Sequence, residues 1–249
     1  MESGKVLRNS QIIILGVCIA VATIVSSIII SKGFLKVMKF TKEIITVTGS
    51  ASKEIKSDYV AWRGFFSRRE ADLVTAYKKL QADLNAVKAY LASKGVDVKE
   101  IIASQIDTQT IYKKNESGND TNEVGGYRLS QNIEVRSNDV DKITQVSRES
   151  TELINQGIEF VSNAPEYFYT KIDELKIQML AMATQNAKAR AENMAKATGN
   201  KIGFMRSAKM GVFQITPVNS TEVSDWGVND TGSLDKKVTA VVSVGFAIE

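Results

Sequence analysis

The stretch Thr170–Gly199, TKIDELKIQMLAMATQNAKARAENMAKATG, decides the fold because it is the longest helical pattern outside the N-terminal apolar run. Thr170 lies three residues before Asp173, as at a helix start, and Gly199 followed by Asn200 is typical of a helix end. Apolar residues recur at spacings of three and four: Ile172, Leu175, Met179, Met182, Ala183, Ala187, Ala191, Met194 and Ala195. We predict an amphipathic helix that packs on a sheet or a neighbouring subunit, with an alanine-rich second half that lets another backbone approach closely.

The opposite face of this helix is basic, which raises the question of a nucleic-acid partner. It carries Lys171, Lys176, Lys188, Arg190, Lys196 and Lys201. Acidic residues at Asp173, Glu174 and Glu192 balance them, and Glu192 and Lys196 form a favourable pair four residues apart. We therefore interpret this face as solvated and predict no nucleic-acid partner.

Composition excludes several classes of chemistry. The chain has 249 residues, of which 43% are hydrophobic and 24% charged, and its net charge is +4. A chain of this length can form one sizeable core or two small lobes. Cys18 is the only cysteine and there is no histidine. Zinc sites of Cys/His type, Ser-His-Asp and Cys-His catalysis and internal disulfides are therefore excluded. Carboxylate chemistry is the class that counting leaves open, so a carboxylate-dependent hydrolase is an alternative.

An apolar run at residues 12–30, IIILGVCIAVATIVSSIII, carries no charge and is long enough to cross a hydrocarbon core of ~30 Å at 1.5 Å per residue. It is a membrane helix or a signal peptide. No A-x-A-like cleavage site follows, so we predict an uncleaved single-pass anchor. The expected organisation is a tail at 1–11, the anchor at 12–30, a basic linker at 31–42 and a domain at 43–249.

The charges beside this run bear on its orientation. Lys5 and Arg8 precede it, whereas four lysines follow it at Lys32, Lys36, Lys39 and Lys42. The positive-inside rule taken alone leaves the C-terminal domain in the cytoplasm, but large domains translocate despite their charges.

Strand and helix patterns alternate along the rest of the chain. We predict strands at 44–49 and 55–66, then a helix that opens with a capping box at Ser67–Glu70 and ends at Gly95. A hairpin follows, with strands at 101–112 and 127–136 and a polar tip at 113–126. A helix capped by 137–139 and ended by Gly157, a strand at 158–161, and strands at 201–216 and 238–248 complete the list.

This order predicts an α+β fold with mixed or antiparallel sheets and three main helices, preceded by one N-terminal transmembrane helix. The last strand, residues 238–248, is apolar on both faces. We therefore expect it to lie centrally in a sheet or against another chain.

Three segments resemble the SIMPL-domain family of bacterial cell-envelope proteins. They are ITVTGSASKEIKSDYVAW (45–62), the run at 164–203 that contains NAKARAENMA (186–195), and MRSAKMGVFQITPVNS (205–220). The resemblance implies an α+β domain outside the cytoplasm, an association with envelope or oxidative stress, and ring-like or channel-like homo-oligomers in some members. It implies no catalytic site, so no functional residue is carried over.

Two clusters merit consideration as sites, and we interpret both as structural. Tyr59, Trp62, Phe65 and Phe66 lie beside Arg63, Arg68 and Arg69, but strand alternation divides the aromatic rings between two faces, so they form no platform for single-stranded nucleic acid. Asp225, Asp230 and Asp235, with Glu222 and Asn229, lack the spacing of a calcium loop. Four N-x-Ser/Thr triplets, starting at Asn115, Asn119, Asn219 and Asn229, mark loops.

We predict no catalytic, cofactor-binding or metal-binding residues and no cofactor. The expected function is that of a non-enzymatic protein of the bacterial inner membrane, anchored through residues 12–30, with an extracytoplasmic domain that forms homo-oligomers through strand edges. The alternative is a binding or signalling module that contacts a protein, of unknown identity, through the hairpin tip at 113–126.

Overall fold

The computed structural model describes residues 3–249, with side chains for residues 14–35 and 43–249. Met1 and Glu2 lie outside the described part, as do the side chains of residues 3–13 and 36–42. The predicted tail at 1–11 therefore lies among residues whose side chains are not described. The same holds for most of the charged residues beside the apolar run, which bear on its orientation.

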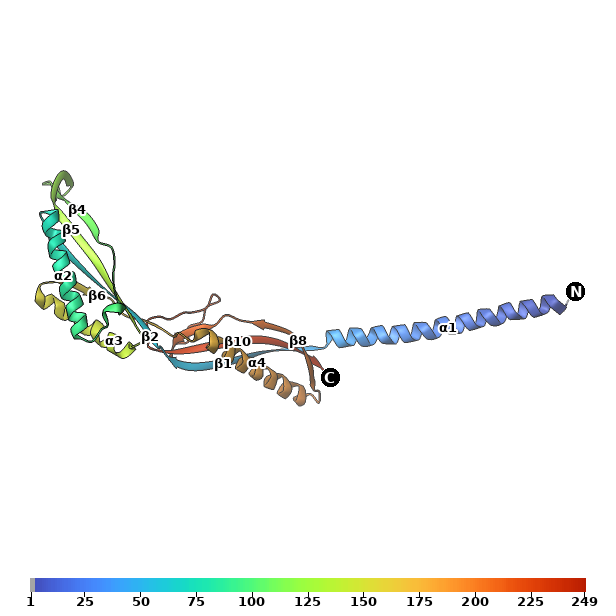
Figure 1. Cartoon of the computed structure of the whole chain (residues 1–249). Coiled ribbons are helices and arrows are strands. Elements are labelled where there is room, and N and C mark those ends of the chain that lie inside the picture. The colour runs from blue at the N-terminus through green and yellow to red at the C-terminus, as the bar shows by residue number, and fades with distance from the viewer. Residues whose placement is uncertain (1–2) are drawn as a thin grey trace. The chain divides into compact units, whose positions relative to one another are not determined.

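The N-terminal region is one continuous helix, α1 (Ser3–Lys42), drawn in blue in Figure 1. Within it, Ile14–Leu35 is a 22-residue segment of mean hydropathy 2.6 with no buried residues. This segment is long and apolar enough to cross a membrane, and a signal sequence would have the same properties. The predicted anchor at 12–30 lies inside the helix, and the predicted linker at 31–42 is helical as well.

The chain forms two compact units, described here one at a time. The first contains residues 1–51, 180–211 and 241–249, and the second contains residues 52–179 and 212–240. Three elements contribute residues to both units: β1 (Ile44–Lys56), α4 (Ile172–Ala197) and β10 (Asp235–Ile248).

The first unit is a small sheet with α4 on one face. The strand order is β1-β10-β8, and β8 (Ile202–Met210) is antiparallel to β10. The helix stripe is confirmed at Ala183, Ala187, Ala191 and Ala195, which are all buried. Contact with β1 is close, since a Cβ on Gly49 would lie 2.3 Å from the carbonyl oxygen of Ala183. The alanines therefore do let a strand backbone approach.

Two residues of the predicted apolar stripe are exposed and not buried. Met182 and Met194 are 48% and 53% exposed, so the buried stripe of α4 is narrower than the sequence pattern indicated. The prediction for the last strand is confirmed in its position: β10 lies between β1 and β8. One face of β10 is fully buried from Val238 to Phe246, whereas Thr239, Val241 and Ser243 on the other face are half-buried.

The second unit contains a six-stranded antiparallel sheet of order β3-β5-β2-β6, with β4 on β5 and β7 on β2. Its strands are β2 (Tyr59–Glu70), β3 (Ile101–Ala103), β4 (Asp107–Lys114), β5 (Asp120–Ser137), β6 (Glu159–Ser162) and β7 (Glu166–Phe168). α2 (Leu73–Ser93) lies along β2 and β5 (Figure 1), and α3 (Val140–Glu149) is continued by the 3-10 helix η2 (Ser150–Gln156). The remaining short elements are η1 (Val98–Glu100) and β9 (Gln214–Pro217), which pairs with β10.

The core of this unit lies between the sheet and the helices. Trp62, Phe66, Leu80, Ile133 and Ile143 are completely buried. The period-two pattern of β5 is confirmed, because Leu129, Gln131, Ile133 and Val135 are buried. The predicted α+β class, with antiparallel sheets and three helices after an N-terminal apolar helix, is therefore what the structure shows.

Several predicted boundaries are wrong. Ser67–Glu70 is not a capping box but the end of β2, and the cap of α2 is Asp72, whose carboxylate accepts from the Thr75 amide at 2.8 Å. A strand was predicted at 55–66, yet Ile55 lies near the end of β1, which ends at Lys56, and the chain turns at 57–58 before β2 begins. At this turn the Asp58 carboxylate accepts hydrogen bonds from the backbone amide and the hydroxyl of Thr170. That hydroxyl therefore does not cap α4, which begins at Ile172.

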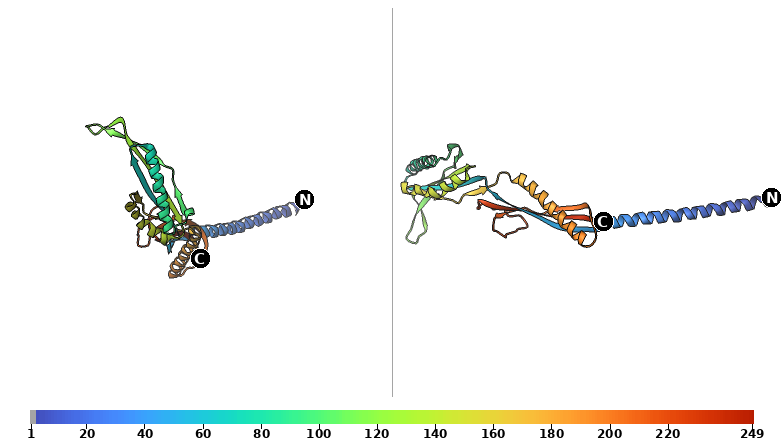
Figure 2. Two further views of the ribbon diagram at one scale, coloured as in Figure 1. Left: turned by 60° about the vertical axis from the view of Figure 1, so that its left-hand side comes forward. Right: turned by 90° about the horizontal axis from the view of Figure 1, so that it is seen from below.

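The hairpin tip is much shorter than the predicted loop at 113–126. β4 extends to Lys114 and β5 begins at Asp120, so only residues 115–119 form the turn. Figure 2 shows this hairpin extending past the end of α2. The strand predicted at 201–216 is also divided, into β8 and β9, with residues 211–213 between them.

Candidate functional site

The outer edge of β8 in the first unit is open. Among the described residues β8 pairs only with β10, and every residue from Phe204 to Met210 is exposed. Phe204 is 75% exposed, and Met205 and Met210 are 57% and 55% exposed. An edge strand presents unpaired amide and carbonyl groups, which another strand can bind.

The opposite edge of the same sheet, formed by β1, is covered by side chains of α4. Asn186 Oδ1 accepts from the Ser50 amide at 3.2 Å, and Arg190 Nη1 donates to the Thr48 carbonyl at 3.0 Å. Residues 48 and 50 are two apart in a strand, so their polar groups point in the same direction. The first unit therefore has one covered edge and one open edge.

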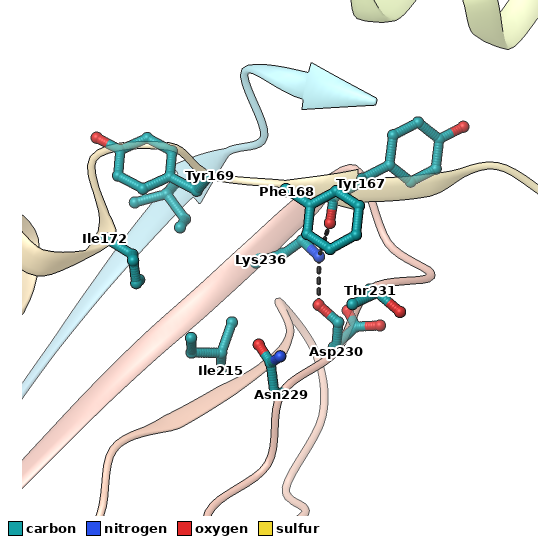
Figure 3. A pocket seen from close by; sticks show the side chains of 10 residues that line it. Tyr167, Phe168, Tyr169, Ile172, Ile215, Asn229, Asp230, Thr231 and Lys236 are labelled. Atoms are coloured by element: carbon teal, nitrogen blue, oxygen red, sulfur yellow. Dashed lines mark hydrogen bonds between the residues drawn. The ribbon is translucent and has the colours of Figure 1, made fainter. Parts of the chain in front are cut away.

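The second unit contains a cavity of about 170 Å³. It is lined by ten residues: Ile55, Tyr167, Phe168, Tyr169, Ile172, Ile215, Asn229, Asp230, Thr231 and Lys236. Figure 3 shows the Lys236 ammonium group between the backbones of Tyr167 and Asp230, with the Phe168 ring beside it. The Tyr167 amide of β7 donates to the carbonyl of Thr231 at 2.7 Å, which holds β7 against the loop that contains Thr231.

The charged groups of this pocket are buried or partly buried. Lys236 is only 2% exposed, and its Nζ donates to the carbonyls of Tyr167, at 2.9 Å, and Asp230. Burial lowers the pKa of Lys236, and the charge of Asp230 opposes this shift. Burial alone would raise the pKa of Asp230, but hydrogen bonds from Ser233 and Gly232, with the charge of Lys236, lower it overall. Burial therefore disfavours the charged form of Lys236, whereas the contacts of Asp230 favour its charged form.

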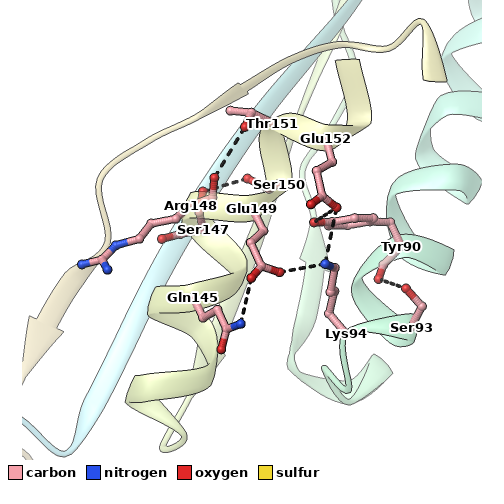
Figure 4. Close-up of polar contacts among 10 residues, drawn as sticks. All are labelled: Tyr90, Ser93, Lys94, Gln145, Ser147, Arg148, Glu149, Ser150, Thr151 and Glu152. Carbon is pink, nitrogen blue, oxygen red and sulfur yellow. Dashed lines mark hydrogen bonds and ion pairs between the residues drawn. The ribbon is translucent and has the colours of Figure 1, made fainter. Parts of the chain in front are cut away.

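A second polar cluster joins the end of α2 to α3 and η2 (Figure 4). Lys94 Nζ lies 2.7 Å from Glu149 and 3.4 Å from Glu152, and the Tyr90 hydroxyl donates to Glu152 at 3.3 Å. Glu149 raises the pKa of Lys94, and Lys94 with Gln145 lowers the pKa of Glu149. Since Lys94 is paired with both Glu149 and Glu152, we interpret the cluster as a link that holds the end of α2 against α3 and η2.

The family comparison agrees with the resemblance seen in the sequence. The model of SIMPL, protein of unknown function (DUF541), matches residues 45–246. The chain belongs to the SIMPL family. A search of curated proteins finds no match for this SIMPL protein.

Solved structures with partial likeness to this SIMPL protein include two amidases of the hydantoinase/carbamoylase family. One from Burkholderia phymatum is 12% identical, with a TM-score of 0.27, and the likeness covers 55% of this chain and 35% of that one. Another from Burkholderia multivorans is 12% identical, with a TM-score of 0.25, covering 49% and 29%. The matched part spans about a third of the amidases' length, and similarity at this level carries no argument about function.

The aromatic cluster of the SIMPL domain forms no single surface, as predicted. Trp62 and Phe66 are completely buried, and Tyr59 and Phe65 lie on the other face of β2. Two of the neighbouring arginines are engaged in ion pairs: Arg63 with Glu134 and Glu166, and Arg68 with Asp83.

The acidic loop does not assemble as a cluster either. Asp230 Oδ1 accepts from the amides of Gly232 and Ser233 at 2.9 and 3.2 Å, as in a turn. Across the described side chains, no group of three histidine, cysteine or acidic residues is placed to hold a metal ion.

Sequence reasoning missed two features of the SIMPL domain. The cap formed by Asn186 and Arg190 was not predicted, because Arg190 was interpreted as part of a solvated helix face. Lys236 did have a signal in the sequence: counting back by two from Val238 places it on the buried face of β10, where it lies.

Proposed function

We propose that this chain is a non-enzymatic, membrane-anchored envelope protein whose SIMPL domain associates with a second copy through β8. The exposed outer edge of β8, with its apolar Phe204, Met205 and Met210, is the observation that carries the proposal. The absence of histidine from the sequence and its single cysteine support the non-enzymatic part. α1 supports the anchor, because its apolar segment has the length and hydropathy of a membrane span.

The covered edge of β1 supports a particular symmetry. A sheet with two open edges can add copies head to tail, which gives rings or filaments. Here Asn186 and Arg190 occupy the β1 edge, so β8 is the available edge and its natural partner is the β8 of another copy. Such a contact uses the same surface on both copies and closes a two-fold dimer.

Charge selects the register of this antiparallel pair. β8 has a β-bulge at Arg206, because Ser207 pairs with Gly245 whereas Met205 pairs with Phe246. Counted along the sequence, a register centred on Ser207 runs from Phe204 to Met210 and places Phe204 opposite Met210 of the other copy. It also places Arg206 opposite Ala208, and Lys209 opposite Met205. A register centred on Arg206 would oppose two arginines, and like charges directly opposite each other are destabilising. We therefore propose the register centred on Ser207.

Charge substitutions at Ala208 test this proposal. Ala208→Arg places a cation opposite Arg206 of the second copy, whereas Ala208→Glu places an anion there. Each cross-strand pair contributes roughly 0.2–1 kcal/mol and occurs twice, so the dimer dissociation constant changes by about 2- to 30-fold. Ala208→Arg weakens and Ala208→Glu strengthens association of the full chain in nanodiscs, measured by fluorescence transfer. Equal constants for the two variants would contradict the register.

The location of the domain is a further part of the proposal. We propose that it lies on the outer side of the bacterial inner membrane, in an envelope-stress or oxidative-stress setting, as the family resemblance implies. If the domain lies on this side, a cysteine introduced in the turn at 115–119 of a Cys18→Ser chain reacts with a membrane-impermeant reagent on intact spheroplasts. Labelling only after lysis would place the domain in the cytoplasm.

The hairpin tip supports a second candidate function, contact with a protein partner. Asn115 Oδ1 accepts from the amides of Ser117 and Asn119 at 3.0 Å, which fixes the turn. Beside it, Tyr112 and Val124 are paired across the strands and are 45% and 46% exposed. Replacing both with serine abolishes partner capture if the tip binds, and unchanged capture would exclude it.

A further inference from the structure

One end of the sheet in the first unit is tethered close to the apolar segment of α1. That segment ends at Leu35, and residues 36–42 continue as helix, which advances ~10 Å at 1.5 Å per residue. Glu43 alone separates α1 from β1. With the apolar segment in a membrane, as proposed above, this end of the sheet lies ~10 Å from the hydrocarbon core, and any tilt of α1 shortens that distance.

The turn from α4 to β8 lies at the same end of the sheet. The Ile248 amide donates to the Glu43 carbonyl at 3.1 Å, and Lys201 and Glu249 exchange two backbone hydrogen bonds of 2.8 Å. Neighbouring strands are ~4.8 Å apart, so Lys201 lies about two strand spacings across from Glu43. Main-chain hydrogen bonds therefore tie this turn to the residue that follows α1.

Two lysines at the turn are free to bind a ligand. Lys196 and Lys201 are exposed and line an open hollow of about 520 Å³, together with Glu192, Gly199, Asn200 and Ile202. The ion pair expected between Glu192 and Lys196 is not formed, because Glu192 lies 3.8 Å from the ammonium group of Lys188 instead. Within the part of the chain whose side chains are described, the ammonium groups of Lys196 and Lys201 have no hydrogen-bond or ion-pair partner.

The charge and the position of this end suit an anionic bilayer surface. Three further lysines, Lys36, Lys39 and Lys42, lie in the sequence between the apolar segment and β1, and Glu43 and Glu249 are the opposing acids. A bilayer measures ~40–45 Å with its headgroups and ~30 Å without them, so each headgroup layer extends ~5–8 Å beyond the core. A Debye length of ~8 Å covers the remaining gap to the hollow.

We infer that the hollow at the turn from α4 to β8 binds the phosphate of an anionic phospholipid of the membrane that holds α1, with Lys196 and Lys201 as the binding residues. Lysine binds phosphate as a point charge on a flexible stem. A lipid is the occupant because the tether keeps the hollow beside the headgroup layer, where lipid phosphates are concentrated. The inference rests on the anchor proposed above, but not on the β8 pairing, which uses residues 204–210.

Native mass spectrometry tests the inference on the full chain released from nanodiscs that contain equal amounts of phosphatidylglycerol and phosphatidylcholine. The natural chain retains phosphatidylglycerol in excess. In the double variant Lys196→Gln, Lys201→Gln, the ratio of retained phosphatidylglycerol to phosphatidylcholine falls by about 25-fold, because each lysine near an anionic surface contributes about fivefold. A fall smaller than about threefold overturns the inference.

A matched double variant, Lys53→Gln, Lys209→Gln, removes the same charge from exposed positions near the far ends of β1 and β8. It leaves the ratio unchanged, and an equal fall there overturns the assignment to the hollow.

The natural Cys18 separates this inference from the anchor on which it rests, because it lies inside the apolar segment. In the same nanodiscs a water-soluble maleimide leaves Cys18 unlabelled when α1 spans the bilayer. An unlabelled Cys18 with an unchanged lipid ratio in the Lys196, Lys201 variant overturns the hollow alone. A labelled Cys18 overturns the anchor and the inference with it.

Discussion

Asn186 on α4 accepts a hydrogen bond from the backbone amide of Ser50 on β1, at 3.2 Å. A helix side chain thus occupies a position that a neighbouring strand would otherwise fill. With the bond from Arg190 to the Thr48 carbonyl, it covers one edge of the sheet, while β8 at the other edge is exposed. This asymmetry is the basis for proposing a closed dimer instead of an open chain of subunits.

Removing the cap is expected to open the second edge. In the double variant Asn186→Ala, Arg190→Ala, the Ser50 amide and Thr48 carbonyl lose their partners and can pair with β8 of another copy. We predict assemblies larger than a dimer by mass photometry of the full chain in detergent. Gln185→Ala, at an exposed position of the same helix, is the control and stays dimeric. An unchanged mass for the double variant would show that the cap does not limit growth.

Gly49 fixes the contact between β1 and α4. A Cβ there would lie 2.3 Å from the Ala183 carbonyl oxygen and 2.4 Å from the Ala187 amide nitrogen, so Gly49→Ala forces the strand and helix apart. Overpacking of this kind costs about 1–3 kcal/mol. Hydrogen exchange of the α4 amides is expected to accelerate by about 5- to 150-fold. Gly232→Ala, whose Cβ would have 3.6 Å of clearance, has no such effect on α4.

The ion pair between Arg68 and Asp83 is expected to be costly to break from one side. Asp83 has only 6% of its side chain exposed, and its Oδ1 lies 2.7 Å from Arg68 Nη2. Arg68→Met leaves this carboxylate buried without its cation and destabilises the second unit by roughly 3 kcal/mol. The double variant Arg68→Met, Asp83→Leu recovers most of that loss. Urea unfolding followed by the fluorescence of Trp62 measures both, and a double variant no more stable than the single one would contradict the account.

The Lys94 cluster gives the second unit a specific response to acid. The pKa of Glu149 is lowered by Lys94 and Gln145, so the folded state holds this proton more weakly than the unfolded state. The stabilisation is complete above the ordinary pKa of 4.5 and is lost as pH falls through the lower folded value. Glu149→Gln is therefore less stable than the natural chain at pH 7, and the difference disappears once the pH has fallen below the lowered pKa of Glu149 in the folded state. A difference that persists at low pH would show that the charge is not its source.

The same cluster predicts the opposite sign in alkali. Glu149 raises the pKa of Lys94, so the folded state binds this proton more tightly. Its contribution is complete below the ordinary pKa of 10.5 and decreases as pH rises beyond it. Lys94→Met is thus expected to differ from the natural chain at pH 7 but to converge with it in strong alkali, as measured by urea unfolding.

The long patterns of the sequence predicted the fold well, because burial imposes a period on them. The alanines of α4, the alternation in β5 and the two-sided strand β10 each follow from which face is covered. The boundary at Ser67 was wrong because pairing with distant strands decided it. Ser67 resembles a cap, yet β2 continues through it because its backbone pairs with Ser130 and Glu159 on both sides.

The candidate sites were less predictable, because they depend on residues far apart in the chain. Lys236 meets Tyr167 across 69 positions, and Asn186 meets Ser50 across 136. No local pattern indicates such pairs. Excluding the aromatic platform for nucleic acid was easier. The alternation of residues along β2 alone predicts that Trp62 and Phe65 lie on opposite faces of the sheet.

A disulfide at the centre of the proposed β8 pair tests the central claim most directly. In a Cys18→Ser chain, Ser207→Cys places the new cysteine opposite itself, at the ~4.5–5.5 Å Cα separation of directly paired residues, which suits a disulfide. We predict rapid oxidation to a covalent dimer in native membranes, whereas Ala208→Cys stays monomeric because its partner lies two positions away. A Ser207→Cys chain that resists cross-linking while Ala208→Cys dimerises would contradict the proposed association.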